Sequence, residues 1–214
     1  MDANFVTLER WTWAPFGGVE EFAETGPGRA ISYLDAGSEI CFVAPVQGGA
    51  DATIYRPDHT RETISSEMTQ PTIVNAGDFT VYGDNNASNC KNAGQTRSIS
   101  IVAGIWRGDP TVDVTLPGGL TGEVLAKGSP AAFPAEPAVV TIERLVMEPG
   151  ASVALSDGTI VLVYVEDGAV TVTGADNGDI ALDALDGTQL IADGMALETS
   201  VQAAVIVVTI ASAP

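Results

Sequence analysis

The chain has 214 residues, of which 45% are apolar, so it can form one large β domain or two small ones with buried cores. It carries 28 acidic and 9 basic residues, and its formal net charge of -19 repels nucleic-acid phosphates and anionic lipid headgroups. We therefore expect no nucleic-acid partner. The longest apolar runs, residues 159–165 and 203–210, are far below the roughly 20 residues that span a bilayer, so we also expect no membrane insertion.

The first half of the chain is predicted to consist of short strands separated by turns. Asp35-Ala36-Gly37-Ser38 predicts a hairpin between the strands on either side of it, and Gly26-Pro27-Gly28 can only be a turn. Residues 61–70 are polar enough to predict a loop or a single helical turn. Strand-like patterns cover residues 5–13, 30–34, 39–43, 51–55, 72–76, 79–82 and 98–105.

Residues 107–138 differ in composition from the rest of the chain. They are rich in proline and glycine and contain only two short strand-like pieces, Thr111 to Leu116 and Gly122 to Leu125. We interpret them as a linker that carries a hairpin.

The second half opens with residues 139–172, whose apolar residues alternate or run in short β-branched clusters. The turns Pro149-Gly150, Asp157-Gly158 and Asp167-Gly168 divide it into pieces of strand length. Helical periodicity is almost absent from the whole chain, which predicts an all-β fold.

The two halves share short sequence landmarks in the same order. Residues 6–10 match 140–144, 33–37 match 164–168, 73–77 match 190–194, and 99–105 match 205–210. The repeat predicts two tandem antiparallel β units, either barrels or jelly rolls. We place the first barrel at residues 1–106, the linker at 107–138 and the second barrel at 139–214.

These landmarks resemble motifs of the cupin superfamily. The Pro149-Gly150 turn, the tyrosine-containing strand that ends at Gly168 and the strand from Ala169 to Val172 are similar to the first cupin motif. The turn Ala192-Asp193-Gly194 is similar to the glycine turn that opens the second motif. With the same landmarks in its first half, the chain resembles a bicupin with two tandem cupin-like antiparallel β-barrels. The resemblance says little about function, because cupins include dioxygenases, isomerases, epimerases, seed storage proteins and sensors.

The sequence departs from the cupin pattern where metal ligands are expected. A metal-binding cupin places a His-x-His pair, a Glu and a third His around the motif glycines, which here are Gly37 and Gly168. This chain has one histidine, so neither barrel can build that site, and we expect no metal and no other cofactor. At or near the ligand positions the first half has Glu24, Gly26, Ala30 and Ser88, and the second half has Leu155, Asp157, Val161 and Val205.

Two cysteines, Cys41 and Cys90, are the only residues that bear on the cellular compartment. They are far apart in sequence and form no C-x-x-C motif, so they do not suggest a metal or redox pair. We predict a disulfide, because Cys90 lies in an expected polar loop, residues 84–92, where a free thiol would be exposed; two buried thiols in a reducing compartment are the alternative. Met1-Asp2-Ala3-Asn4 has no features of a signal peptide. Because we predict a disulfide, we expect an extracellular or cell-surface protein whose signal peptide is not part of this sequence. A cytoplasmic location is the alternative.

Aromatic side chains are concentrated in the first half. Aromatic residues that line a β-barrel can stack on a sugar or another flat ligand, but they can equally fill the core of the larger barrel. The second half is rich in Val, Ile, Leu and Ala, and this composition indicates a packed structural or assembly module. Our candidate ligand-binding residues are Trp11, Trp13, Tyr33, Tyr82 and His59.

Other chemically active groups have simpler explanations. His59 could act in acid–base catalysis, but Asp58 and Arg61 beside it indicate a solvated loop. Glu20, Glu21 and Glu24 could serve as acid and base if they were buried together, and a solvated acidic turn explains them as well. Glu9 and Glu143 recur in both halves, and we interpret them as charge pairs at strand edges with Arg10 and Arg144.

An acidic stretch in the second half offers oxygen ligands for Ca²⁺. It contains Asp176-Asn177-Gly178-Asp179, followed by Asp183 and Asp186, but its spacing is not that of a recognised calcium loop. We assign no catalytic residue and no metal ligand.

The sequence thus favours a non-catalytic, metal-free protein of cupin fold. Its predicted role is to bind a small molecule or glycan, or to assemble with itself or a partner as a homo-oligomer, outside the cytoplasm. The alternative is a metal-independent enzyme of isomerase or lyase type that uses His59 or buried carboxylates of the first barrel.

Overall fold

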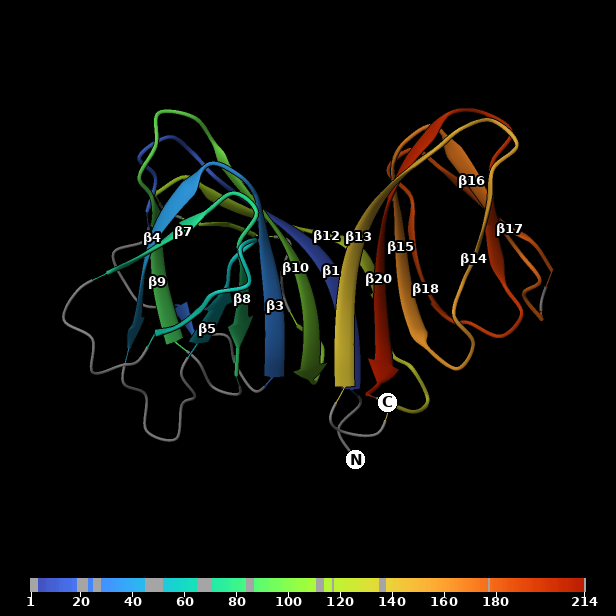
Figure 1. Ribbon diagram of the computed structural model, residues 1–214, viewed down its shortest axis with the longest axis horizontal. Coiled ribbons are helices and arrows are strands. Elements are labelled where there is room, and N and C mark those ends of the chain that lie inside the picture. The colour runs from blue at the N-terminus through green and yellow to red at the C-terminus, as the bar shows by residue number, and fades with distance from the viewer. Residues whose placement is uncertain are drawn as a thin grey trace. The chain divides into compact units, whose positions relative to one another are not determined.

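The computed structural model describes residues 4–18, 23–24, 28–44, 52–64, 71–83, 87–110, 114–116, 118–134, 138–176 and 178–213. All elements in these residues are β-strands, and they can be followed in Figure 1. The predicted all-β fold class is therefore confirmed. The described residues contain no helix that is long and apolar enough to cross a membrane.

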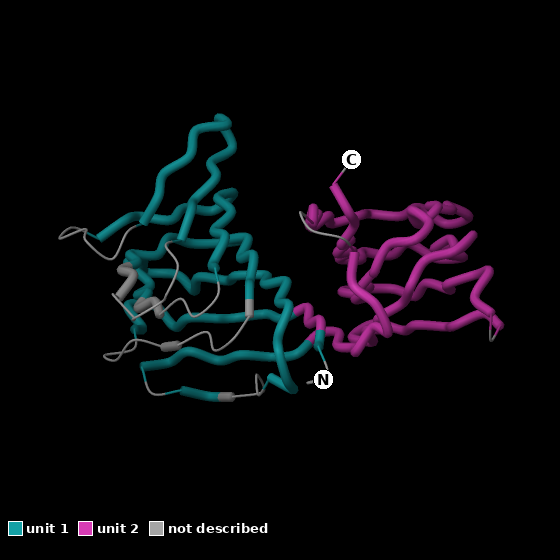
Figure 2. Tube along the Cα trace, turned by 90° about the horizontal axis from the view of Figure 1, so that it is seen from below, with its two compact units in different colours: residues 1–5, 9–124 teal, residues 6–8, 125–214 magenta. Residues whose placement is uncertain are grey.

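The chain forms two compact units, which Figure 2 shows in teal and magenta. Unit 1 comprises residues 1–5 and 9–124, and unit 2 comprises residues 6–8 and 125–214. The division differs from the expected one, since residues 107–124 of the expected linker belong to unit 1 and residues 125–138 to unit 2.

The strands of the first half lie in two sheets. One has eight strands in the order β11-β12-β1-β10-β3-β8-β5-β6, and the other has four in the order β2-β9-β4-β7. In the first sheet, β11 is Val114–Leu116, β12 Leu120–Gly128, β1 Asn4–Trp13, β10 Ser98–Arg107, β3 Gly28–Ala36, β8 Phe79–Tyr82, β5 Ala52–Tyr55 and β6 Arg61–Ile64. In the second, β2 is Ala23–Glu24, β9 Ala87–Asn92, β4 Ser38–Ala44 and β7 Thr72–Asn75.

The predicted hairpin between residues 107 and 138 forms, whereas the loop predicted at residues 61–64 is a strand. β11 and β12 form an antiparallel hairpin with Leu116 opposite Leu120, in the region where a hairpin was expected. Residues 61–64, expected to be a loop or helical turn, are instead strand β6, paired with β5 so that Ile64 lies opposite Ala52. The side chain of Ile64 is 2% exposed, and its burial explains why this polar segment is a strand.

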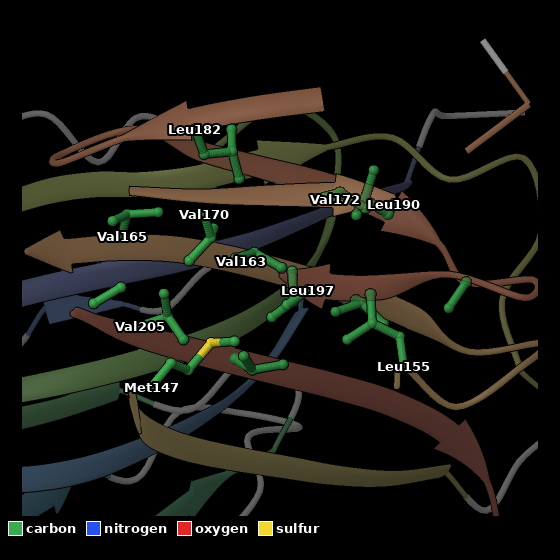
Figure 3. Close-up of a cluster of buried hydrophobic side chains, with 14 residues drawn as sticks. Met147, Leu155, Val163, Val165, Val170, Val172, Leu182, Leu190, Leu197 and Val205 are labelled. Atoms are coloured by element: carbon green, nitrogen blue, oxygen red, sulfur yellow. The ribbon is translucent and has the colours of Figure 1, made fainter. Parts of the chain in front are cut away.

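The second half forms two four-stranded sheets that enclose an apolar core. The orders are β13-β20-β15-β18 and β14-β19-β16-β17. Side chains from both sheets, such as Val163, Val205, Val170 and Leu197, point toward one another in Figure 3. Here β13 is Ala138–Met147, β20 Ala203–Ser212, β15 Ile160–Asp167, β18 Gly187–Ile191, β14 Ser152–Ala154, β19 Ala196–Glu198, β16 Ala169–Thr173 and β17 Ile180–Asp183.

The predicted hairpin at residues 35–38 is wrong. β3 pairs with β10 and β8, whereas β4 pairs with β9 and β7, so the chain changes sheets at Gly37 instead of folding back on itself. β15 and β16 make the same change at Gly168. Both glycines have a positive φ, +87° and +80°, and each corner lies against the start of the long strand β10 or β20.

When the two units are matched strand by strand, one of the four landmarks pairs differently from the match made by sequence. Residues 190–194 were matched with 73–77, but the β7–β8 turn of unit 1 corresponds to the β17–β18 turn of unit 2. In unit 1 the Asp78 Oδ2 atom accepts a hydrogen bond from the Asn75 amide, and in unit 2 the Asp186 Oδ2 atom accepts one from the Asp183 amide, both at 2.9 Å.

The backbone bonds of the two turns also agree. The amide of Leu34 donates to Asp78 O, and the amide of Val165 to Asp186 O, both at 3.0 Å. The return bonds, from the amides of Gly77 and Leu185, are both 2.8 Å long. The sequence comparison missed this match because Gly77 aligns with Leu185, a leucine that adopts a φ of +74°.

The corner at Gly168 predicts a large effect of a single methyl group. A Cβ added there would lie 2.2 Å from the carbonyl oxygen of Gln202, whereas a Cβ on Gly158, which also has a positive φ, would meet no atom within 4 Å. We expect Gly168→Ala to lower the free energy of unfolding by roughly 3 kcal/mol and Gly158→Ala by about 1 kcal/mol. Urea denaturation followed by circular dichroism measures both, and equal losses would contradict this account of the corner.

The β17–β18 turn predicts a stabilising substitution. Leu185 is 71% exposed and has a left-handed backbone, so its side chain adds strain and no core packing. We expect Leu185→Gly to raise the free energy of unfolding by about 0.5–1 kcal/mol, because the relief of the left-handed strain exceeds the added chain entropy. Leu182→Gly, in the same hairpin but in the core, should instead destabilise strongly. A loss of stability in Leu185→Gly would refute the assignment.

Candidate functional site

The inner face of unit 1 is defined by a cluster of buried residues from both of its sheets. Strand alternation places Glu39 and Cys41 on the same face of β4, and Cys41 lies directly opposite Cys90 of β9. The two cysteines form a disulfide, as predicted. The core cluster consists of Trp13, Leu34, Cys41, Ala52, Ile54, Ile64, Val74, Cys90 and Leu120.

A buried carboxyl group lies on this inner face. Glu39 is 6% exposed, and its Oε1 atom accepts hydrogen bonds from the hydroxyls of Ser98 at 2.9 Å and Ser100 at 3.3 Å. Burial raises the pKa of Glu39, and the two serine hydrogen bonds oppose this shift only in part. Glu39 therefore keeps its proton to a higher pH than an exposed glutamate does.

A tyrosine on the inner face of the eight-stranded sheet lies near Glu39. Tyr82 of β8 pairs with Ala30 and Ala52, both buried, so its ring is on the inner face. Its pKa is raised by burial first and by the negative charge of Glu39 second, while a hydrogen bond with Thr80 lowers it. The phenol is thus a neutral hydrogen-bonding group at physiological pH.

β1 contributes two tryptophans to the same cluster. Trp13 is buried in it and Trp11 packs against it, half-exposed. The Trp11 Nε1–H group donates a 2.8 Å hydrogen bond to Oε2 of Glu9, which is 1% exposed. Glu9 is therefore a buried acceptor and not the exposed strand-edge charge that the sequence interpretation expected. Arg10 forms an exposed ion pair with Glu123, at 3.5 Å.

Two of the candidate ligand-binding residues lie elsewhere. Tyr33 is on the face of β3 opposite that of the core residue Leu34, and it packs against Phe79 with ring centroids 4.8 Å apart. His59 is exposed, in the turn between β5 and β6, with a φ of +67°. The structure thus brings Trp11, Trp13 and Tyr82 together on the inner face and leaves Tyr33 and His59 outside it.

The turn that carries His59 is held by ion pairs close to it. Arg56 Nη1 lies 2.8 Å from Oδ2 of Asp78, which is buried, and Arg56 Nη2 also pairs with Glu62. Thr60 donates backbone and hydroxyl hydrogen bonds to Asp58 Oδ1. The Arg56–Asp78 ion pair joins the β5–β6 turn to the β7–β8 turn. Arg56 and Asp58, near His59, therefore have structural roles in these turns.

The other acidic candidates are partly outside the described residues. Glu20 and Glu21 fall there, as do Asn177 and the side chain of Glu24. Asp176, Asp179, Asp183 and Asp186 are exposed, and Asp186 holds the amide of Asp183 in the turn described above. No observation beyond this acidic composition points to a calcium ligand set.

The positions expected to hold metal ligands in unit 2 are part of its core or of its surface. Leu155, Val161 and Val205 belong to the apolar cluster. Asp157 is exposed, and its Oδ1 atom accepts a 2.7 Å hydrogen bond from the Gly194 amide. The apolar cluster of unit 2 therefore consists of aliphatic side chains and Met147, and the unit also buries Tyr164, Thr159 and Thr199. Unit 1 differs in that it buries carboxyl groups and tryptophan together with hydroxyl groups.

Comparison with known proteins supports the fold. No protein-family model matches the sequence, and no curated protein matches it. Pumpkin seed globulin is 12% identical, with a TM-score of 0.56 over 95% of this chain and 76% of that chain. AerE of Microcystis aeruginosa is 10% identical, with a TM-score of 0.54 over 98% and 88%. The bacterial pirin YhhW of Escherichia coli, solved in complex with nickel(II), is 11% identical, with a TM-score of 0.51 over 99% and 84%.

Seed globulins and pirins are cupin-family proteins. The chain has a cupin fold. Sequence identities of 10–12% show this fold alone, and cupins include both enzymes and storage proteins, so the function has to be argued from the side chains. Within this fold, the buried polar residues Glu39, Ser98 and Ser100 of unit 1 are the side chains on which a function can be argued.

Sequence reasoning missed the buried polar set of Glu39, Ser98 and Ser100. A signal was present, because Glu39 and Cys41 are two residues apart in a predicted strand and must share a face. Once Cys41 is assigned to a disulfide in the core, Glu39 has to be an inward-facing carboxyl. The serines could be assigned only when the pairing of β10 with β3 was known.

The raised pKa of Glu39 predicts a pH dependence of stability. The ordinary pKa is 4.5, and a folded-state pKa above it means that the unfolded chain loses its proton first as the pH rises. The wild-type chain should therefore lose stability as the pH rises from about 4.5 to the folded-state pKa. Glu39→Gln should remove this loss, and the exposed Glu148→Gln should retain it. Urea midpoints over a pH series measure the effect, and parallel curves for wild type and Glu39→Gln would contradict it.

Proposed function

We propose that this chain is a non-catalytic binding protein whose ligand site is the inner face of unit 1, with unit 2 as a packed structural module. One observation carries the proposal: the two units share the same strand connectivity, but unit 1 buries the carboxyl of Glu39 with Ser98 and Ser100, whereas unit 2 buries no carboxyl among its described residues. Buried polar groups cost free energy unless they are paired, so a purely structural barrel has no need of Glu39, Ser98 and Ser100.

The chemistry of this face favours an uncharged polar ligand with a flat apolar surface, as in a carbohydrate. Trp11 and Tyr82 are only half-buried and offer ring faces, and the Tyr82 phenol and the Glu39 carboxyl offer hydrogen bonds. Two buried glutamates, Glu9 and Glu39, and the net charge of -19 disfavour anions.

A location outside the cytoplasm is part of the proposal. The Cys41–Cys90 disulfide supports it, since structural disulfides persist mainly in oxidising compartments. We further propose that the chain assembles as a homo-oligomer, in line with its likeness in fold to a seed globulin, a storage protein.

A second candidate function is metal-independent acid–base catalysis of the isomerase or lyase type. The buried, proton-retaining Glu39 is the observation that favours it, because raised carboxyl pKa values are typical of general acids. His59 no longer supports this candidate, since it is exposed in the β5–β6 turn.

Intrinsic fluorescence tests the proposed site directly, because all three tryptophans, at positions 11, 13 and 106, lie in unit 1. We expect neutral mono- or disaccharides to change the tryptophan emission in a saturable manner. Trp11→Leu should weaken binding about tenfold or more through lost stacking, and Trp13 and Trp106 would still report it. Tyr33→Leu, on the outer face, is the matched control and should bind as wild type does.

The same titration separates the two functions. A binding protein leaves the bound sugar unchanged, whereas an enzyme would convert it and would lose turnover, but not binding, in Glu39→Gln. A broad sugar panel without any saturable change in emission would overturn the carbohydrate proposal. Equal weakening by Trp11→Leu and Tyr33→Leu would overturn the assignment of the site to the inner face.

A further inference from the structure

The disulfide and the buried carboxyl of unit 1 form one cluster. The Sγ atoms of Cys41 and Cys90 and a carboxylate oxygen of Glu39 all lie within 4.8 Å of one another. All three residues are buried, with exposed fractions of 2%, 8% and 6%. Within the part of the chain that the structure describes, no other group of three such residues converges in this way.

One oxygen of Glu39 remains available. Both serine hydrogen bonds fall on Oε1, and among the described residues none donates to Oε2. A buried carboxyl oxygen without a donor is costly in a core, and it is uncommon unless the group has a chemical role. The serines also fix the orientation of the carboxyl group, so Glu39 is held in place beside the sulfur atoms.

We propose that Glu39, Cys41 and Cys90 form a Zn²⁺-binding site when the disulfide is reduced. An external dithiol or phosphine supplies two electrons, the S–S bond breaks, and each sulfur takes up a proton. Zn²⁺ then displaces the two thiol protons and the carboxyl proton of Glu39 and is bound by two thiolates and one carboxylate. The oxidised chain lacks this site, because disulfide sulfur is not a thiolate.

The donor set fits zinc better than other common cations. Two thiolates select soft or borderline metals over Mg²⁺ and Ca²⁺, and zinc accepts a carboxylate oxygen as a third ligand. Three protein ligands leave the fourth tetrahedral position for water. The separations of up to 4.8 Å have to shorten by little, since two ligand atoms about 2.0–2.3 Å from one zinc lie within roughly 4 Å of each other.

The sheet register builds this site. Cys41 and Cys90 are 49 residues apart, yet β4 and β9 pair them directly, and Glu39 lies two residues before Cys41. The positions differ from those expected for the metal ligands of cupins, where this chain has residues such as Ala30 and Val161. The site shares Glu39 with the proposed sugar-binding face, but it exists only when the disulfide is reduced, whereas sugar binding is proposed for the oxidised chain.

Cobalt is a suitable probe, because thiolate-bound Co²⁺ has a charge-transfer absorption in the near ultraviolet. We expect the full-length chain, reduced with a phosphine, to bind one equivalent of Co²⁺ with this absorption and to release it to Zn²⁺. The oxidised chain should show no such band. Glu39→Gln should lower the affinity about tenfold or more, the double variant Cys41→Ser/Cys90→Ser should abolish the band, and Glu143→Gln, an exposed glutamate of β13, should match wild type.

Each other outcome overturns the proposal. A reduced, folded chain that gives no charge-transfer band has no such site. Wild-type affinity in Glu39→Gln would show that the carboxylate is not a ligand. If reduction alone unfolds unit 1, Zn²⁺ must restore its circular dichroism and raise its melting temperature, because a metal that binds the native state stabilises it; failure to do so also refutes the site. Sugar binding by the oxidised chain is measured separately, so the two proposals fail independently.

Discussion

The arrangement of unit 1 depends on a single strand corner at Gly37. There the chain leaves the eight-stranded sheet as β3 and enters the four-stranded sheet as β4, with a backbone conformation that side-chain-bearing residues rarely adopt. The change of sheets brings Glu39 and Cys41 to face the serines of β10 across the interior. Gly168 makes the same corner in unit 2, where the strand that follows contributes only apolar side chains to the core.

The two units therefore show one backbone with two kinds of interior. The aspartate turns at Asp78 and Asp186 agree in the lengths of their hydrogen bonds to 0.1 Å. In unit 2 the enclosed space is filled by aliphatic residues, which stabilise by burial alone. In unit 1 the disulfide ties β4 to β9 beside a carboxyl whose pKa is raised by burial. Apolar packing therefore stabilises the interior of unit 2, whereas paired polar groups and the disulfide distinguish the interior of unit 1.

Burial also decides which aromatic residues can serve a ligand. Trp11, Trp13 and Tyr82 came together because β1 and β8 both turn these side chains toward the core. Tyr33 and His59 were also candidates from the sequence, but strand alternation puts Tyr33 on the outer face and a tight turn exposes His59. Partial exposure of Trp11 and Tyr82 leaves ring surface that the core does not use, and this surface supports the binding role proposed here.

The amino-acid sequence by itself determined the all-β class, the duplication, most strand positions and the disulfide partners, because alternation, turn residues and the presence of just two cysteines are local or countable properties. It also showed that one histidine cannot supply the metal ligands usual in cupins. Only the tertiary structure decided that the chain changes sheets at Gly37, that Leu185 replaces the glycine of the repeat, and that Glu39 lies beside the disulfide. These features depend on the pairing of strands far apart in sequence, and pairing is decided by the packing of the whole sheet and not by any local pattern.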